Sequence, residues 1–170
     1  MIRCDLSGDI ASFLDKEKSA DPATYSTAKS DWDSARTNGA TGAYAALYTD
    51  SKTHCGQLSS SAADPGGASY RLVINFVIQF KDQASATSGY TDGSFFNFSV
   101  SDVKAGGVPV TQGTATGLTD NSIVRSAPLA GQTVFLALWQ NQTFLVILAI
   151  LNVDPAASLK AAVAENARIK

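Results

Sequence analysis

The sequence predicts one α+β domain over residues 1–170, in which an antiparallel β-sheet of four to six strands is flanked by N-terminal helices and a C-terminal helix. Three patterns predict this class: helical spacing in residues 5–50, apolar alternation in 69–80, and two apolar strand-length segments joined by a polar turn in 133–151. The sheet and the C-terminal helix are expected within 69–170. No domain boundary is placed between the two parts, because the N-terminal helices need a sheet to pack on.

Two or three helices are expected in the N-terminal segment. Ser7 or Asp9 is a suitable N-cap for the first helix. Asp21-Pro22 combines an N-cap with a proline at the first helical position, and Asn38-Gly39 is a typical helix end. These signals delimit the second helix.

Apolar residues three and four positions apart show which helix faces point to the core. The second helix carries one such stripe, formed by Tyr25, Ala28, Trp32 and Ala35. The same spacing predicts a third short helix with Tyr44, Leu47 and Tyr48. Residues 56–68 are a loop by composition.

The middle of the chain predicts strands and one short helix. In SYRLVINFVIQF, residues 69–80, the even-numbered side chains form an apolar face and the odd-numbered ones a mixed face, as in an antiparallel strand with one well-covered side. A short helix is expected after Lys81-Asp82 and should end near Gly89. Further strands are expected at 95–100 and, within a long irregular stretch, around 108–116.

The segment TVFLALWQNQTFLVILAIL, residues 133–151, raises the question of a membrane span. Gln140, Asn141 and Gln142 divide it into halves of about eight to ten residues, whereas a membrane helix needs about 20 consecutive apolar residues. Each half has the β-branched and aromatic content of a strand, so a hairpin is predicted. Because both hairpin faces are apolar, burial between two helical layers is favoured over helices on one face and a partner subunit on the other.

Asp154-Pro155 repeats the earlier cap signal and predicts a final helix over 155–169 that packs across the hairpin. Its expected apolar stripe contains Ala156, Leu159, Val163 and Ala167. Its expected outer face contains Lys160, Glu165 and Lys170.

Composition argues against some function classes. The chain is 45% apolar and 16% charged, which argues against disorder and leaves a surface rich in uncharged polar groups. The chain has 13 Lys and Arg against 15 Asp and Glu and no basic cluster. It therefore lacks the positive potential that nucleic-acid binding requires. We therefore expect no nucleic-acid partner, no transmembrane segment, no cofactor and no metal.

Cys4 and Cys55 are expected to form a disulfide, because both lie in polar, poorly packed surroundings. Such a bridge closes a loop of about 50 residues and contributes roughly 4 kcal/mol by the loop-entropy relation. Two unrelated thiols are the alternative, and lipid attachment at Cys4 lacks the expected small-residue site. The opening MIRCDLSGD has no apolar signal region, so the protein is either cytosolic or begins at a Met1 that replaces a removed targeting segment.

His54 is the single histidine, so a Ser-His-Asp or Cys-His mechanism would have to use it. No flanking sequence resembles a cysteine-hydrolase elbow, and the cysteines lack the close spacing of metal ligands. Asp31 and Asp33 fall on different faces of the second helix. We therefore assign no catalytic residue, and a hydrolase using His54 or Asp120 is the least favoured class.

Two places are candidates for ligand binding. Thr119, Asp120 and Asn121 form a candidate ligand loop, although these residue types are also ordinary turn formers. Trp32 and Trp139 would line a candidate apolar pocket between helices and sheet, although aromatic residues at these periodicities more often belong to a core.

The order of patterns in the last hundred residues resembles small cell-envelope lipoproteins and sensor-type domains of Gram-positive-type bacteria with a PsbP-like fold. The matching features are YRLVINFVIQF, KDQASATSGY, TGLTDNSIVRS, the segment VFLALWQNQTFLVILAIL and an Ala-rich helix ending in NARIK. The resemblance implies a non-catalytic binding or sensing module. The N-terminal helical segment and the position of Cys4 depart from it, which leaves lipid attachment and ligand type open.

The leading hypothesis is a non-enzymatic extracytoplasmic module, secreted or anchored in the cell envelope, that binds, senses or assembles with a small apolar ligand or a protein partner. It follows from the composition, the expected disulfide and the lack of a catalytic constellation. The alternative is an interaction subunit of a homo-oligomer or larger complex that docks through the apolar hairpin 132–151.

Overall fold

The computed structural model describes residues 1–58, 68–93, 95, 98–129 and 131–169, and builds them around one sheet. In chain order the elements are β1 (Ile2–Arg3), β2 (Gly8–Asp9), α1 (Ile10–Ala20), α2 (Pro22–Thr37), β3 (Ala40–Thr49), α3 (Lys52–Leu58), β4 (Leu72–Phe80), α4 (Gln83–Asp92), α5 (Val100–Lys104), η2 (Ala105–Gly107), β5 (Val110–Gln112), η3 (Gly113–Thr116), β6 (Ser122–Leu129), β7 (Gln132–Asn141), β8 (Phe144–Leu151) and α6 (Pro155–Asn166). Among these helices, none is long and apolar enough to cross a membrane.

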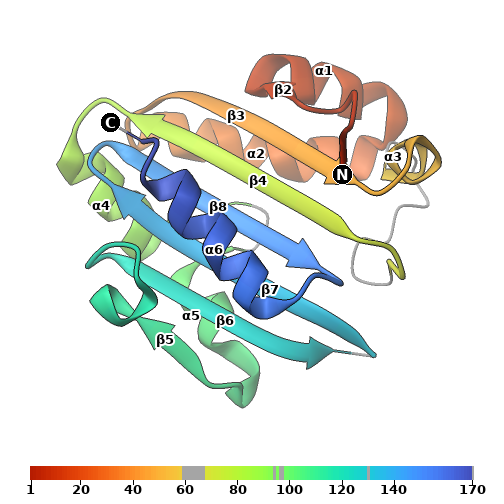
Figure 1. The fold of residues 1–170 in the computed structure, drawn as a ribbon. Coiled ribbons are helices and arrows are strands. Elements are labelled where there is room, and N and C mark those ends of the chain that lie inside the picture. Colours follow the sequence, from red (N-terminus) through yellow and green to blue (C-terminus); the bar gives the residue numbers. More distant parts are fainter. Residues whose placement is uncertain (59–67, 94, 96–97, 130, 170) are drawn as a thin grey trace.

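Across the described part of the chain, the sheet has eight strands and every pairing between them is antiparallel. The strand order is β1-β3-β4-β8-β7-β6-β5, and β2 also pairs with β3. Figure 1 shows α6 on one face of the sheet and α1, α2, α4 and α5 on the other. The predicted α+β class is confirmed, with more strands than expected.

The predicted hairpin is the centre of this sheet. β7 and β8 pair from Val134↔Leu151 to Asn141↔Phe144, and Gln142 in the turn has a left-handed φ of 53°. The two faces of the hairpin contribute side chains to two separate hydrophobic cores. Leu138, Leu145, Ile147 and Leu151 face the four-helix side, and Trp139, Val146, Leu148 and Ile150 face α6. Burial between two helical layers is therefore confirmed.

Aspartates begin four of the helices. The carboxylates of Asp9, Asp21, Asp82 and Asp154 accept backbone N–H groups in the first turns of α1, α2, α4 and α6. These bonds satisfy donors that have no partner within the helix. The caps predicted at Asp9, Asp21 and Asp154 are confirmed, as are the stripe of α2 on the core and its end at Asn38.

The third N-terminal helix was predicted wrongly, because residues 40–49 form strand β3. Tyr44 and Tyr48 point to one face, while Leu47, together with Ala45 and Thr49, points to the other and is buried. The spacing of Tyr44, Leu47 and Tyr48 also fits a helix, and the small residues between them have weak strand propensity. Pairing with β4 along its whole length overrides that local preference.

The predicted strand at 95–100 does not form among its described members. Phe95 and Phe98 make an isolated bridge, and Val100 already begins α5, while residues 96 and 97 lie outside the described residues. Of the strand expected around 108–116, only Val110–Gln112 forms, as β5, whereas Gly113–Thr116 is the 3-10 helix η3. No element was predicted for residues 122–129, which form strand β6, because Pro128 interrupts the pattern of a central strand. Of the predicted loop 56–68, residues up to Leu58 belong to α3, and 59–67 lie outside the described residues.

The predicted apolar stripe of α6 is displaced by about one residue. Ser158 and Ala162 are the buried residues of this helix and the predicted Leu159 packs on the same core, whereas Val163 is 39% exposed. Small side chains let the helix approach a sheet face that already carries bulky residues such as Trp139. Glu165, expected outside, instead accepts a hydrogen bond of 2.5 Å from Nδ2 of Asn75 on β4, and burial raises the pKa of Glu165.

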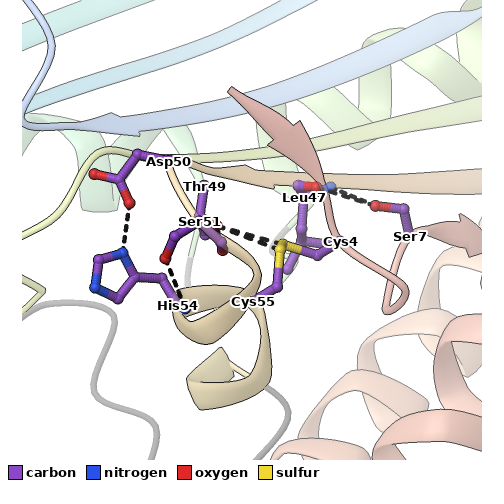
Figure 2. Close-up of a disulfide and its surroundings, with 8 residues drawn as sticks. All are labelled: Cys4, Ser7, Leu47, Thr49, Asp50, Ser51, His54 and Cys55. Carbon is purple, nitrogen blue, oxygen red and sulfur yellow. Dashed lines mark hydrogen bonds and ion pairs between the residues drawn. A yellow bond between two sulfur atoms is a disulfide. The ribbon is translucent and has the colours of Figure 1, made fainter.

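The N-terminal residues cover the outer edge of β3 (Figure 2). Between the short strands β1 and β2, the N–H of Cys4 donates to the Leu47 carbonyl at 2.8 Å, and Oγ of Ser7 accepts the Leu47 N–H at 2.8 Å. A serine hydroxyl thus replaces a missing strand neighbour. The disulfide from Cys4 to Cys55, with a Cα–Cα distance of 5.2 Å, ties this segment to α3. The predicted bridge is present.

Glu17 is a buried carboxyl on the core face of α1, with 3% of the residue exposed. Burial, and to a smaller extent the negative charge of Asp21, raises the pKa of Glu17 from 4.5 to about 7. Folding therefore raises the protonated fraction of Glu17 near neutral pH.

Removing the disulfide should lower the free energy of unfolding by about 2–4 kcal/mol, because the unfolded chain gains the freedom of a 51-residue separation. The test is urea unfolding of the wild type with and without dithiothreitol and of the Cys4→Ala/Cys55→Ala double variant. The reductant should shift the wild-type midpoint toward that of the double variant and leave the variant unchanged. An unshifted wild-type midpoint would contradict a stabilising bridge.

Glu17→Gln should stabilise the protein at pH 8, by on the order of 2 kcal/mol, and change little at pH 5. The folded-state pKa of Glu17 lies above the unfolded value. The stability that this carboxyl contributes is therefore fully present below about pH 4.5 and is lost as the pH rises through about 7. Urea unfolding at both pH values measures this difference. Asp15→Asn on the exposed face of α1 is the control, and an equal gain in both variants would show that Glu17 is not the cause.

Candidate ligand-binding site

A cavity of about 310 Å³ lies between α2, the end of α4 and the sheet. Its volume is at the lower end of the range for small-molecule sites. The described residues that line it are Ser30, Asp31, Ser34, Ala35, Asn38, Ile78, Phe80, Gly89, Asp92, Gly93, Phe95, Phe98 and Leu145. They come from two helices, two neighbouring strands and the segment after α4.

The floor of the cavity is apolar. Ile78 and Phe80 on β4 and Leu145 on β8 are at most 5% exposed, and Phe95 is 3% exposed. Phe98 is partly buried against the same core. Strand alternation places these β4 and β8 side chains on the helical face, so the sheet holds the floor rigidly.

Gly89 sets the distance between α4 and this floor. A Cβ atom at Gly89 would lie 2.7 Å from Cζ of Phe80, which is closer than such atoms approach. The absence of a side chain lets the last turn of α4 rest on the Phe80 ring. One wall of the cavity thus depends on a glycine.

The rim is polar. Ser30, Ser34 and Asn38 on α2 and Asp92 on α4 are exposed, and Asp31 is half-buried. The prediction that Asp31 and Asp33 lie on different faces is confirmed, because Asp31 lines the cavity whereas Asp33 pairs with Lys29 at 2.5 Å outside it.

A second hollow lies beside α1 and is broad and shallow. Asp5, Ser12, Asp15 and Lys16 are among its lining residues, and the Lys16 ammonium donates to the carbonyls of Asp5 and Ser7. Because Lys16 and Ser12 already bond within the fold and this hollow is more open, the cavity beside α2 is the better candidate.

The structure does not bring Trp32 and Trp139 together. Trp32 packs on the core that faces the four helices, whereas Trp139 is fully buried in the core under α6. The sheet separates them. Trp32 lies on the same helix as the cavity but is not among its lining residues.

The candidate loop Thr119, Asp120 and Asn121 is engaged by the fold. Nδ2 of Asn121 donates to Oε1 of the buried Gln140 at 2.7 Å, and Thr119 donates to the Asn121 carbonyl. Nε2 of Gln140 in turn donates to groups on α4, including the Gln83 carbonyl at 3.2 Å. The loop therefore joins β6, β7 and α4, while Asp120 stays exposed.

His54 is held by its neighbours rather than aimed at a nucleophile (Figure 2). Nδ1 lies 2.5 Å from Oδ1 of Asp50, and the ring stacks on Tyr70 with centroids 4.1 Å apart. The Asp50 carboxylate also accepts the Arg71 N–H, and the His54 hydrogen bond lowers the pKa of Asp50. This arrangement fastens α3 to the start of β4. Among the described residues, no group of three His, Cys, Asp or Glu side chains gathers as a metal site.

Comparisons with known proteins add little. No protein-family model matches the chain, and no curated protein matches it. Among solved structures it is similar to the extracellular domain of PknH from Mycobacterium tuberculosis, with a TM-score of 0.37, 9% sequence identity, and coverage of 77% of this chain and 66% of that chain. A TM-score this low does not establish a shared fold. The resemblance to PsbP-like domains gains no support from these comparisons.

Sequence reasoning missed the cavity, because its residues come from distant segments. The helical face of α2 that carries Ser30, Asp31 and Ser34 was readable from the 3.6-residue period. The sequence could not predict that this face of α2 lies next to the end of α4, because that depends on the position of α4 over β4. A signal was available in Gly89, a glycine inside a helical pattern that is otherwise unfavourable.

Replacing Gln140 by Leu should lower the free energy of unfolding by about 2 kcal/mol, because Asn121 and α4 lose buried hydrogen-bond partners. Asp120→Ala, at the exposed neighbour, should change it by less than about 0.5 kcal/mol. Thermal and urea unfolding of both variants measure the contrast. Equal effects would show that the Gln140 network does not hold the loop.

Proposed function

We propose that this chain is a non-enzymatic extracytoplasmic binding or sensing module whose small ligand occupies the cavity between α2 and α4. The observation that carries the proposal is the cavity itself, which combines a buried apolar floor with a rim of hydroxyl, amide and carboxylate groups. Apolar burial supplies affinity in such sites, and a few polar groups orient the ligand.

The Cys4–Cys55 disulfide supports the extracytoplasmic part of the proposal. Disulfides form and persist in oxidising compartments and are rare in the cytosol. The low charged content of the chain agrees with this location.

The other two function classes have weaker support. Both faces of the hairpin 132–151 are covered within the chain, so docking through that hairpin gains no support from the fold. A hydrolase would need the His54 ring beside a nucleophile, whereas the ring contacts Asp50 and Tyr70, and the Ser51 hydroxyl accepts the backbone N–H of His54.

The neutral fluorophore N-phenyl-1-naphthylamine tests the cavity. Its fluorescence should rise saturably when it binds the folded protein, because it enters an apolar site. Ser34→Trp places a large side chain at the rim and should weaken binding at least roughly tenfold, since bound ligand and indole compete for the same volume.

Ser26→Trp is the matched control, because Ser26 is also an exposed serine of α2 but does not line the cavity. Circular dichroism checks that both variants are folded. Saturable binding that Ser34→Trp leaves intact, or a lack of saturable binding to the wild type, would overturn the proposal.

A further inference from the structure

Glu165 is one of only two glutamates in the chain, and its carboxyl lies against the sheet. It belongs to the last turn of α6, the helix that covers this face of the sheet (Figure 1). Oε1 of Glu165 accepts a hydrogen bond of 2.5 Å from Nδ2 of Asn75 on β4. This bond attaches the end of α6 to a strand that lies 90 residues earlier in the chain.

The other end of the Asn75 amide lacks a donor. Oδ1 of Asn75 is buried, and no described group donates a hydrogen bond to it. A buried acceptor without a donor is rare and destabilising, because it has lost its bonds to water. An ionised Glu165 cannot supply the missing bond, since both oxygens of a carboxylate are acceptors.

A protonated Glu165 supplies this donor. A carboxylic acid carries one O–H donor beside its carbonyl acceptor, so its hydrogen-bonding groups match those of a primary amide. Nδ2 of Asn75 then donates to Oε1, and the hydroxyl at Oε2 donates to Oδ1. Turning the amide round would place Oδ1 against Oε1, which also requires a proton on the carboxyl. Both orientations of Asn75 therefore call for the acid form of Glu165.

Burial favours that acid form. It raises the pKa of Glu165 and outweighs two groups that favour the carboxylate, namely Nδ2 of Asn75 and the positive charge of Arg168. The other ionisable side chains on this face of the sheet or in the loop beside α6 are Arg3 of β1, Tyr44 and Tyr48 of β3, Arg71 next to β4, and Asp120. Arg3 is engaged by the Tyr44 hydroxyl, to which it donates.

The same turn of α6 has a second polar attachment, which does not titrate. Nδ2 of Asn141 on β7 donates to Oδ1 of Asn166 at 2.9 Å and to the Asn166 carbonyl at 3.2 Å. Amide groups keep their donors and acceptors across the physiological pH range. Of these two attachments, the one between Asn75 and Glu165 alone can respond to pH.

We infer that Asn75 and Glu165 form a pH-sensitive acid–amide pair, in which the protonated carboxyl binds both ends of the amide and holds the last turn of α6 on the sheet. The folded-state pKa of Glu165 lies above its ordinary value of 4.5. The stability that the pair contributes is therefore fully present below that value and is lost as the pH rises through the folded-state pKa. Opening of this turn would expose the core beneath it, to which Val77 and Ile169 belong.

Carbon NMR of protein labelled with ¹³C at the glutamate carboxyls measures the protonation of Glu165. The chain gives only two such signals, and Glu165→Gln and Glu17→Gln each remove one and so assign the other. The Glu165 signal should titrate at a higher pH in the folded protein than in the urea-unfolded protein. A folded-state midpoint at or below the unfolded one would overturn the inference.

Amide hydrogen exchange, corrected for the intrinsic pH dependence of exchange, measures the attachment of α6. Protection of residues 163–169 should fall at least about threefold between pH 5 and pH 8 in the wild type. Glu165→Gln should remove this fall, because a glutamine amide can bond both ends of Asn75 at either pH. Glu17→Gln, the same substitution on the other face of the sheet, is the matched control and should keep it.

Glu165→Leu separates hydrogen bonding from burial, because leucine fills the space and bonds neither end of the Asn75 amide. At pH 5 its last turn should be as weakly protected as that of the wild type at pH 8, and circular dichroism checks that the variant is folded. Protection in Glu165→Leu equal to that in Glu165→Gln would overturn the inference. A pH dependence that survives Glu165→Gln would also overturn it, because another group would then be its source.

Discussion

The hairpin of β7 and β8 is apolar on both faces, and the rest of the fold follows from the need to cover it. A strand with water on neither side needs a packed layer above and below. One layer is the single helix α6, which approaches closely through Ser158 and Ala162. The other consists of α1, α2, α4 and α5. One face is thus covered by a single close helix and the other by four helices, and the candidate cavity lies on the four-helix face.

That space lies between two helices of the four-helix layer, over the sheet. The C-terminal half of α2 and the end of α4 line the cavity, and Phe80 of β4 lies in its floor. Gly89 fixes how low α4 can lie. The cavity is thus a consequence of helix packing on an alternating strand.

Local signals in the sequence predicted most of the elements, but few of the relations between them. The aspartate caps, the alternation of β4 and the polar break of the hairpin are short-range features, so Asp21, Asp154 and Gln142 mark boundaries correctly. β3 was missed because its identity depends on pairing with β4. The stripe of α6 was displaced because close packing on Trp139 selects small residues rather than large apolar ones. The cavity could not be predicted, since its lining joins α2 to α4 through tertiary packing alone.

The way the N-terminal residues cover β3 also bears on aggregation. β3 is a ten-residue strand, and without β1, β2 and the Ser7 hydroxyl its outer edge would offer unpaired N–H and C=O groups to any passing strand. The covering strands are two residues long, too short to hold that position by their own pairing. The bond between Cys4 and Cys55 holds them in place. The disulfide therefore keeps the edge of β3 covered and prevents edge-to-edge association between molecules. A reducing environment would expose this edge before it unfolded the core.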